Sequence, residues 1–422
     1  MARKMKDSGI EWIGEIPEGW EVGQIGQLYS ERRTKVSDKD YPPLSVTMKG
    51  ILPQLSTAAK TDAHDDRKLV CKGDFAINSR SDRRGSCGIS EQDGSISLIN
   101  TVLQPRGEMN PGYYNWLFHT SMFADEFYKW GHGIVDDLWT TGWSDMKKIG
   151  VPVPSKCEQK QLAEHLNIEC SNIDSILSKT RSSIEEYKKL KQTVITQAVT
   201  KGVRGEREMK DSGNPWFGQI PTDWKLSRVG LHFSIILGKM LCNAPLNDTY
   251  TLEPYYCAAD VHFDGVADGE RKKMWFSPIE KDLYRVSVGD LLVVEGGAGA
   301  GGSAIVENQD SDTYIQNSIM IVRSKGNADN RYLRYLLEFL VKQGYIDIVC
   351  NKATIPHFTK DKLSCVPFCP CPTGEQKEIA DYLDAKCAEI DGLIAKKEQL
   401  VKELESYKKS LIYEVVTGKR EV

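Results

Sequence analysis

One sixteen-residue phrase occurs twice in this chain. Residues 5–20 read MKDSGIEWIGEIPEGW, and residues 209–224 read MKDSGNPWFGQIPTDW, an offset of 204 residues. An internal repeat constrains a fold strongly, because repeated segments form equivalent structural units. We therefore expect the 422 residues to hold two copies of one design.

The repeat extends far beyond this phrase. Gly73-Asp74 matches Gly289-Asp290 at an offset of 216, and the segment beginning Glu158-Gln159-Lys160 matches the one beginning Glu375-Gln376-Lys377 at 217. The change of offset places the additional residues of the second half between Lys239 and Gly289.

Both halves have the same order of segments. An arm rich in Gly, Pro and Trp is followed by short β-like runs such as FAIN and LLVVE, separated by Gly, Asp and Asn. A helical piece follows, at residues 116–130 in one half and 331–343 in the other. A proline-rich linker and one long helix complete each half. The mixture predicts an α/β (α+β) fold with two pseudo-symmetric domains.

The two long helices carry an apolar seam at a spacing near 3.5 residues, which predicts a coiled coil. Each spans about 40 residues, or roughly 60 Å, and Gly202 and Gly418 are expected to end them. The nearest partner of each seam is the other, so we expect an antiparallel pair with a domain near each end and an approximate internal two-fold axis. The predicted core is Leu162, Leu166, Ile173, Leu177, Ile184, Val194, Ile379, Leu383, Ile390, Ile394, Val401, Leu404 and Leu411.

The repeated phrase has a structural explanation in this arrangement. The first helix runs through Thr200 into the arm that begins at Met209. The second helix ends near Thr417, and Met5 begins the other arm. The chain is thus nearly circular in design, and the phrase serves two equivalent helix–arm junctions.

Composition excludes several classes of protein. The net charge is only -4, so a DNA-coating protein is not expected. No apolar run approaches the roughly 20 residues of a membrane helix, and eleven cysteines without framework spacing indicate reduced thiols in the cytoplasm. Cys365, Cys369 and Cys371 are interpreted as part of a linker loop, with zinc as the less favoured alternative. No P-loop or HExxH motif occurs, so we expect neither catalytic residues nor a metal site.

Basic side chains cluster at matching places in the two predicted domains. Arg can pair with guanine, and Lys or Arg can neutralise phosphate, although such a cluster can also be merely a solvated face. The loops differ while the frame repeats, as two different recognition surfaces require. The candidate nucleic-acid contacts are Arg32, Arg33, Lys35, Arg80, Arg83, Arg84, Lys239, Arg271, Lys272 and Lys273.

The repeated GIEWIGEIPEGW and GNPWFGQIPTDW arms, the Gly-Asp strands and the two Glu-Gln-Lys helices resemble those of the specificity (S) subunit of a type I restriction–modification system. The resemblance covers the whole chain. It implies two target-recognition domains that each read half of an asymmetric bipartite DNA site, and a coiled coil that acts as a ruler between them. It also implies a non-catalytic chain without cofactors of its own.

The resemblance implies double-stranded DNA and other subunits as partners, without a membrane. Two modification subunits would bind S-adenosylmethionine and methylate adenine. Restriction subunits would use ATP and Mg to translocate and cleave DNA. The expected domains are an N-terminal arm (1–20), target-recognition domain 1 (21–154, here head one), the first long helix (155–205), the repeated arm (206–224), target-recognition domain 2 (225–372, here head two) and the second long helix (373–422).

Two other functions fit parts of the sequence. A coiled-coil scaffold whose heads bind proteins would suit the modest acidic net charge, and absence of salt-sensitive DNA binding by the assembled complex would favour it. A self-sufficient DNA methyltransferase needs a cofactor site that the sequence does not offer. Failure to bind S-adenosylmethionine would exclude it.

Overall fold

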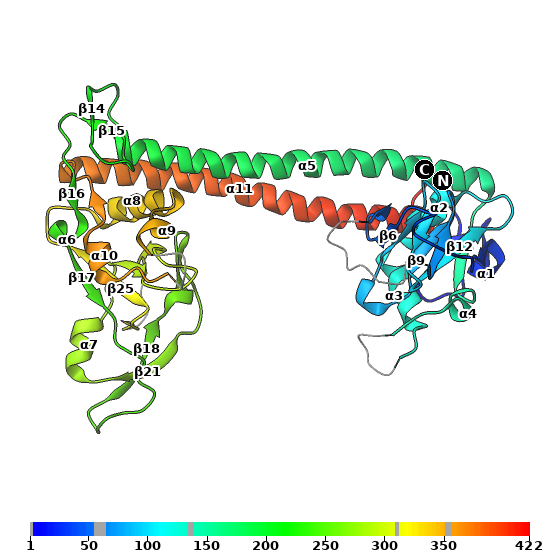
Figure 1. The fold of residues 1–422 in the computed structure, drawn as a ribbon, viewed down its shortest axis with the longest axis horizontal. Helices are drawn as coiled ribbons and strands as arrows, with labels where there is room; N and C mark the ends of the chain where they lie inside the picture. Colours follow the sequence, from blue (N-terminus) through cyan, green and yellow to red (C-terminus); the bar gives the residue numbers. More distant parts are fainter. Residues whose placement is uncertain (1–2, 55–64, 134–138, 309–311, 351–355) are drawn as a thin grey trace. The chain divides into compact units, whose positions relative to one another are not determined.

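The computed structural model describes residues 3–54, 65–133, 139–308, 312–350 and 356–422. The chain divides into two compact units, each with its own core. Unit 1 comprises Met1–Ser182 and Lys397–Val422, and unit 2 comprises Ser183–Lys396. Each unit therefore combines one head with one end of each long helix, α5 (Lys156–Lys201) and α11 (Thr373–Val416) (Figure 1).

Head one is built on a four-stranded antiparallel sheet in the order β10-β9-β12-β4. The predicted strand FAIN is β9, and all four of its residues are buried. Head one has smaller sheets of order β11-β8-β5, β13-β3 and β6-β7, and the N-terminal arm forms the β1-β2 pair. The strands are β1 (Met5–Asp7), β2 (Glu15–Pro17), β3 (Glu21–Gln24), β4 (Tyr29–Glu31), β5 (Lys35–Val36), β6 (Leu44–Thr47), β7 (Gly50–Pro53), β8 (Arg67–Val70), β9 (Phe75–Asn78), β10 (Cys87–Ile89), β11 (Gly94–Ile96), β12 (Asn100–Pro105) and β13 (Gly150–Val153).

Head two repeats this sheet in the corresponding order, β23-β22-β25-β17. Its other sheets have the orders β21-β18-β24, in which β18 and β24 pair in parallel, β16-β26 and β19-β20, and the repeated arm forms the β14-β15 pair. The strands are β14 (Met209–Asp211), β15 (Gln219–Pro221), β16 (Ser227–Arg228), β17 (Phe233–Leu237), β18 (Thr251–Tyr256), β19 (Val261–His262), β20 (Gly265–Val266), β21 (Lys272–Phe276), β22 (Leu291–Val294), β23 (Ser303–Ile305), β24 (Tyr314–Ile315), β25 (Ile319–Ser324) and β26 (Pro367–Phe368).

The helical pieces differ between the heads. The helical piece expected at residues 116–130 is present but consists of two helices, α2 (Pro111–Phe118) and α3 (Ser121–Lys129). Thr120 separates them by accepting a hydrogen bond from the Phe123 amide at 3.2 Å, as an N-cap residue does. Head two has one continuous helix here, α8 (Asn330–Lys342). The shorter helices are α1 (Ile25–Leu28), α4 (Trp143–Met146), α6 (Val229–His232), α7 (Pro278–Tyr284), α9 (Tyr345–Val349) and α10 (Lys360–Ser364).

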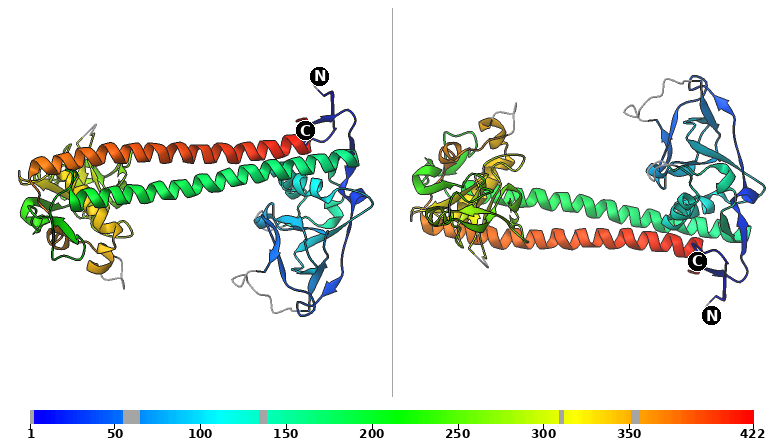
Figure 2. Two further views of the ribbon diagram at one scale, coloured as in Figure 1. Left: turned by 90° about the horizontal axis from the view of Figure 1, so that it is seen from above. Right: turned by 90° about the horizontal axis from the view of Figure 1, so that it is seen from below.

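The ends of α5 and α11 run antiparallel in each unit (Figure 2). In unit 1, Lys408 Nζ lies 2.6 Å from an Asp174 carboxylate oxygen. In unit 2, Lys191 Nζ lies 2.7 Å from Asp391. Asp174 and Asp391 are repeat counterparts, as are Lys191 and Lys408, so the same ion pair is formed once in each unit.

The predicted seam residues divide into two groups by burial. Those near the helix ends also pack into the head cores, so the seam there joins helix to head as well as helix to helix. Leu162, Leu166, Ile173, Leu177, Ile184, Ile379, Leu383, Ile390 and Leu411 are buried, whereas Val194, Ile394, Val401 and Leu404 are partly buried.

The helices end where the glycines predict. α5 stops at Lys201 and α11 at Val416, and both Gly202 and Gly418 have positive φ, of 76° and 72°. Over the described ranges, no helix is long and apolar enough to cross a membrane.

Candidate nucleic-acid interface

The first arm is held against the C-terminal end of α11. Trp20 is buried, and its indole N–H donates to Glu158 of α5 at 3.2 Å, while Arg3 pairs with the same carboxylate. Lys419 Nζ donates to the Ile13 carbonyl at 2.9 Å, and the Tyr413 hydroxyl donates to it at 3.1 Å. The arm therefore docks where the helix ends, as the repeat predicts.

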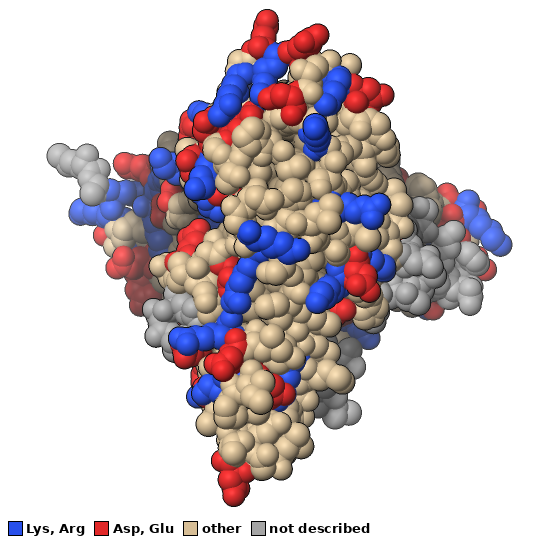
Figure 3. All heavy atoms as spheres, turned by 90° about the vertical axis from the view of Figure 1, so that its left-hand side faces the viewer, with Lys and Arg blue, Asp and Glu red and all other residues tan. Residues whose placement is uncertain are grey.

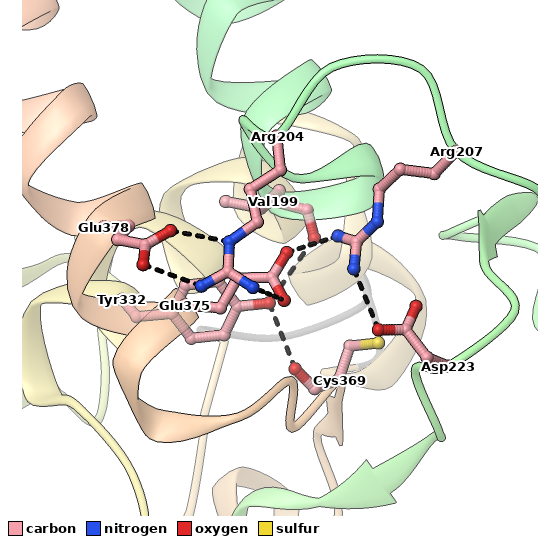
Figure 4. Close-up of polar contacts among 8 residues, drawn as sticks. All are labelled: Val199, Arg204, Arg207, Asp223, Tyr332, Cys369, Glu375 and Glu378. Carbon is pink, nitrogen blue, oxygen red and sulfur yellow. Dashed lines mark hydrogen bonds and ion pairs between the residues drawn. The ribbon is translucent and has the colours of Figure 1, made fainter.

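The second arm forms the equivalent junction in unit 2 (Figure 4). Arg207 takes the place of Arg3 and pairs with Glu375, the counterpart of Glu158, which is completely buried. Arg207 also lies 2.8 Å from Asp223. Arg204 makes two hydrogen bonds of 2.7 Å to Glu378 and lies 3.6 Å from Glu375. Hydrogen bonding from Arg204 lowers the pKa of Glu378, so this outer pair is charged at neutral pH.

A tyrosine completes each junction. In unit 1, the buried Tyr113 hydroxyl donates to the Val416 carbonyl at 2.6 Å, near the end of α11. In unit 2, the Tyr332 hydroxyl lies 3.1 Å from the Cys369 carbonyl and 3.5 Å from that of Val199, near the end of α5 (Figure 4). Each tyrosine thus satisfies a carbonyl group that a helix terminus would leave without an intrahelical partner.

The Glu-Gln-Lys triplet also fixes the heads to the helices. The Gln159 side chain accepts from the Asn110 amide and donates to the Pro154 carbonyl, both at 2.9 Å. Gln376 repeats this by accepting from the Asp329 amide at 2.9 Å and donating to the Cys371 carbonyl at 2.7 Å. The repeated sequence marks these residues, but only the structure shows what they bind.

The Gly-Asp turns require a cation that sequence matching does not find. Asp74 pairs with Arg32 of head one at 2.6 Å, and Asp290 pairs with Arg323 of head two at 2.7 Å. Arg32 follows β4, whereas Arg323 lies on β25. The hydrogen bond to Asp74 raises the pKa of Arg32. Arg32, a candidate nucleic-acid contact, therefore forms an ion pair within head one.

The other candidates of head one are exposed. Arg33 and Lys35 lie on its surface, with Glu31 and Asp66 as ion-pair partners. Arg80, Arg83 and Arg84 lie together in the loop between β9 and β10, around a short 3-10 helix at Ser81–Arg83.

This arginine loop is anchored at both edges. The Arg80 backbone bridges Thr140, and Arg84 pairs with Asp125 of α3 while its guanidinium lies 5.6 Å from the centre of the Tyr128 ring. The structure thus presents Arg80 and Arg83 on an anchored loop, an arrangement that can meet phosphates or base edges.

The candidate nucleic-acid contacts of head two differ in burial, and Lys239 is the buried one. Lys239 is 9% exposed, lies 2.5 Å from Glu280 and is flanked by the rings of Tyr250 and Phe276. Burial raises the pKa of Glu280, but hydrogen bonds from Lys239 and Ser277 outweigh it, so the pKa is lowered overall. Lys239 therefore makes its charge and ring contacts within head two.

The remaining candidates of head two, Arg271, Lys272 and Lys273, are consecutive in sequence but differ in their surroundings. Arg271 pairs with Asp260 at 3.2 Å and stacks over the Tyr256 ring. Lys272 and Lys273, on β21, are exposed. The structure brings these two lysines to the surface, whereas Arg271 has its partners within the head.

The cysteine cluster is not a simple linker loop. Cys369 and Cys371 are buried in the core of unit 2, and Cys365 is exposed. Burial raises the pKa of the Cys369 thiol to about 12, which describes a neutral packing residue. Among the described residues, no group of His, Cys, Asp and Glu is arranged to hold a metal ion.

Comparison with known proteins shows which proteins this chain resembles. Residues 222–403 match the family model of the type I restriction modification DNA specificity domain. Two proteins of Methanocaldococcus jannaschii are similar over almost the whole chain. The MjaX specificity subunit is 25% identical over 96% of this chain and 95% of its own length. The type I restriction enzyme MjaVIII specificity subunit is 24% identical over 96% and 93%.

Solved structures share the fold at low sequence identity. One chain from a structure of a type I R-M system has a TM-score of 0.72, with 15% identity over 96% of this chain and 99% of its own. The HsdS subunit from Thermoanaerobacter tengcongensis has a TM-score of 0.56, with 17% identity over 96% and 98%. One part of this chain therefore matches the type I restriction modification DNA specificity domain, and the chain as a whole is similar to specificity subunits of type I restriction enzymes.

Proposed function

We propose that this chain is the DNA sequence-recognition subunit of a type I restriction–modification complex, and that each head reads one half of an asymmetric bipartite target. One observation carries the proposal. The two heads share a sheet order and a junction but differ in the loop after the Gly-Asp strand. Head one has Arg80, Arg83 and Arg84 there, and head two has Gly296–Gly302. Unlike loops on a common frame suit two unlike half-sites.

The proposal assigns the chemistry to other subunits. Two modification subunits dock on the helices, bind S-adenosylmethionine and methylate adenine, and restriction subunits use ATP and Mg to cleave DNA. The target adenine has to leave the base stack to be methylated. In this division of work, the present chain binds no cofactor and positions the enzyme subunits on DNA, in the cytoplasm.

The paired helices set the unread spacer in this proposal. A heptad inserted into each of α5 and α11 adds about 10 Å of helix, or about three base pairs. We expect the methylated motif to keep both half-sites and to lengthen its spacer by about that amount. An unchanged spacer in the methylome of the insertion variant would show that the helices are not the ruler.

The function itself is tested by methylation. The chain is expressed with its cognate modification subunit in a host that lacks DNA methylation, and methyladenine is mapped by sequencing. A two-part asymmetric motif with a fixed spacer is the expected result. A purified complex that leaves the DNA unmethylated, or that methylates a palindrome, would contradict the proposal.

A further inference from the structure

Head two presents a glycine loop where head one presents arginines. Residues 296–302 of head two read GGAGAGG, so no side chain of this loop can donate or accept a hydrogen bond. If each head reads one half of a DNA target, head two needs another source of polar side chains at this place. The segment that lies against the loop supplies one.

The corresponding edge of head one consists of two segments that are distant in sequence. Arg80 of the loop forms an antiparallel bridge with Thr140, and the Thr141 amide donates to the Ser79 carbonyl at 2.9 Å. The side chains of Arg80 and Thr140 are both exposed. This edge therefore offers a guanidinium on the loop and a hydroxyl group on the facing segment.

Head two forms the same edge with a different pair of side chains. Gly296 forms an antiparallel bridge with His357, and these two residues are the repeat counterparts of Arg80 and Thr140, at offsets of 216 and 217. A Cβ built on Gly296 would be 3.4 Å from Nδ1 of His357, so the imidazole lies directly beside the loop. The polar ring is thus on the facing segment in head two, whereas head one carries its cation on the loop.

The backbone of His357 is held in place while its side chain is exposed. The His357 carbonyl accepts hydrogen bonds from the Cys350 thiol at 3.2 Å and from Lys362 Nζ at 2.7 Å. The next residue, Phe358, is buried, and its amide donates to the Glu295 carbonyl at 2.6 Å. An exposed side chain on a fixed backbone loses less conformational entropy on binding than one on a mobile loop, which suits recognition.

The surroundings of His357 favour a base edge over a phosphate as its partner. In the described part of the chain, two cations, Lys360 and Lys362, and two anions, Asp361 and Glu295, lie closest to it along the chain and across the bridge. Their charges cancel, so this edge does not attract phosphate strongly. A neutral imidazole has one donor and one acceptor nitrogen, and base edges in the major groove present both kinds of partner.

Phosphates have other possible partners in unit 2. Lys272 and Lys273 are exposed on β21. Figure 3 faces the side of unit 2 that carries β16 and α6, where a row of Lys and Arg crosses a largely uncharged surface. Such side chains can make the contacts with phosphate that position a protein on DNA without reading its sequence. Loss of His357 should therefore change which bases are accepted more than it changes the salt dependence of binding.

We propose that His357 is a base-reading side chain of head two, which occupies the place of Thr140 beside the loop and contacts a base edge in the major groove of one half-site. The assignment rests on the proposed function, because it names the residue through which head two discriminates bases. It also gives the unlike loops a chemical consequence. A guanidinium in one head and an imidazole in the other select different bases, which suits an asymmetric target.

Methylome sequencing of the assembled complex tests the assignment. His357→Ala is expressed with the modification subunit in a host that lacks DNA methylation, and methyladenine is mapped. We expect one half of the bipartite motif to accept additional bases, while the other half and the spacer stay unchanged. The affinity of the complex for the original target should fall about tenfold, because a base contact is lost. The slope of log affinity against log salt should stay the same.

His262→Ala is the matched control. His262 is also an exposed histidine of head two, and its Nε2 lies 3.0 Å from the Ala259 carbonyl, away from the glycine loop in sequence. This variant should change neither the motif nor the affinity. Thr140→Ala, at the counterpart of His357 in head one, should leave the half-site that His357→Ala relaxes unchanged.

Four results would overturn the assignment. An unchanged motif in His357→Ala would remove this residue from the interface, and a lower salt slope without relaxed bases would make it a phosphate contact. A lower unfolding temperature of the variant chain would make it a structural residue. Relaxation of the same half-site by Thr140→Ala would mean that the two edges do not serve separate halves. Absence of any bipartite motif from the wild-type complex contradicts the proposed function itself, and this result differs from a wild-type motif that persists in His357→Ala.

Discussion

The two helix–arm junctions use the same residues in different environments. In unit 1, the Glu158 side chain is 31% exposed and pairs with Arg3, which is 29% exposed. In unit 2, the Glu375 side chain is fully buried, Arg207 is 17% exposed, and Arg204 approaches as a second cation. The repeat therefore preserves the contact but not its dielectric surroundings, and the free energy of an ion pair depends strongly on those surroundings.

The largest expected difference is between Glu375→Gln and Glu158→Gln. Removing the buried charge leaves Arg207 with only the exposed Asp223 and Arg204 with Glu378, and breaking a buried pair in this way costs about 3 kcal/mol or more. Breaking a partly exposed pair costs about 1 kcal/mol or less. Urea unfolding of the full-length chain, followed by tryptophan fluorescence, should show a much larger loss of unfolding free energy for Glu375→Gln.

Equal losses in the two variants would mean that burial does not distinguish the junctions. Asp223→Asn removes only the exposed partner of Arg207 and serves as the control, because its side chain is 56% exposed. It should cost about 0.5 kcal/mol at most.

The next comparison concerns Lys35 and Lys239, which the sequence predicts as equivalent nucleic-acid contacts. Lys239 is enclosed with Glu280 and two aromatic rings, whereas the side chain of Lys35 is 64% exposed. Lys239→Ala should lower the free energy of unfolding by about 2 kcal/mol, because it takes the ion-pair partner from Glu280, a partly buried carboxylate. Lys35→Ala should change it by less than about 0.5 kcal/mol.

A stability loss confined to Lys239→Ala would assign that residue to the frame of head two. If Lys239→Ala instead left stability unchanged and weakened DNA binding by the assembled complex, the lysine would be a contact residue after all. Thermal unfolding and DNA titration of both variants separate the two cases.

The repeated parts of the fold, which are the two junctions and the two long helices, could be predicted from the sequence because they occur twice. Repetition identified both junctions, and helical periodicity located α5 and α11. It did not predict the break between α2 and α3, since the signal there is one hydroxyl side chain, Thr120, that caps the second helix. A single N-cap can outweigh the helical propensity of its neighbours.

The candidate nucleic-acid contacts stay predictions, and the structure adds the electrostatic surroundings of each residue. A sequence shows that a residue is basic but not whether a carboxylate lies against it. Arg32, Lys239 and Arg271 each have an acidic partner inside a head, and those partners are 42, 41 and 11 residues away in the chain. The exposed candidates Arg80 and Arg83 stay predictions until DNA binding is measured.

Those two arginines give the third comparison, between the loops of the heads. Arg80→Ala with Arg83→Ala should reduce the slope of log affinity against log salt by about 2 if each contacts a phosphate, because each contact releases about 0.9 of a counterion. DNA affinity of the assembled complex should fall about tenfold, or about 1.4 kcal/mol. The matched control is Ala substitution at Gly296 and Gly299, the uncharged counterparts of Arg80 and Arg83 in head two, neither of which has a positive φ, and it should leave the slope unchanged.

A slope unaffected by the arginine substitutions would remove this loop from the interface. A fall in affinity without a change of slope would instead indicate contacts with bases rather than phosphates. Methylome sequencing then decides which half-site is relaxed, and only one half should change.

The smallest expected effect concerns a carboxylate in helix α8. Glu338 is 6% exposed and lies 3.2 Å from Arg334, and burial raises its pKa above 4.5 despite that pair. The positive charges of Lys191 and Lys342 also oppose the shift, and Asp264 adds to it. Because the pKa of Glu338 is higher in the folded chain than in the unfolded chain, protonation of Glu338 stabilises the folded state. This contribution is complete below pH 4.5 and is lost as the pH rises through the folded-state value.

At pH 7 the buried charge is therefore a cost, and Glu338→Gln should raise the free energy of unfolding by up to about 1 kcal/mol while keeping the shape of the side chain. The gain should shrink as the pH falls from 8 towards 5, and Glu185→Gln, an exposed position on α5, should show neither effect. Urea unfolding at each pH measures both. A loss of stability at pH 7 would mean that the ion pair with Arg334 outweighs desolvation, so α8 would be stabilised by the same kind of buried pair that Glu375 forms at the junction.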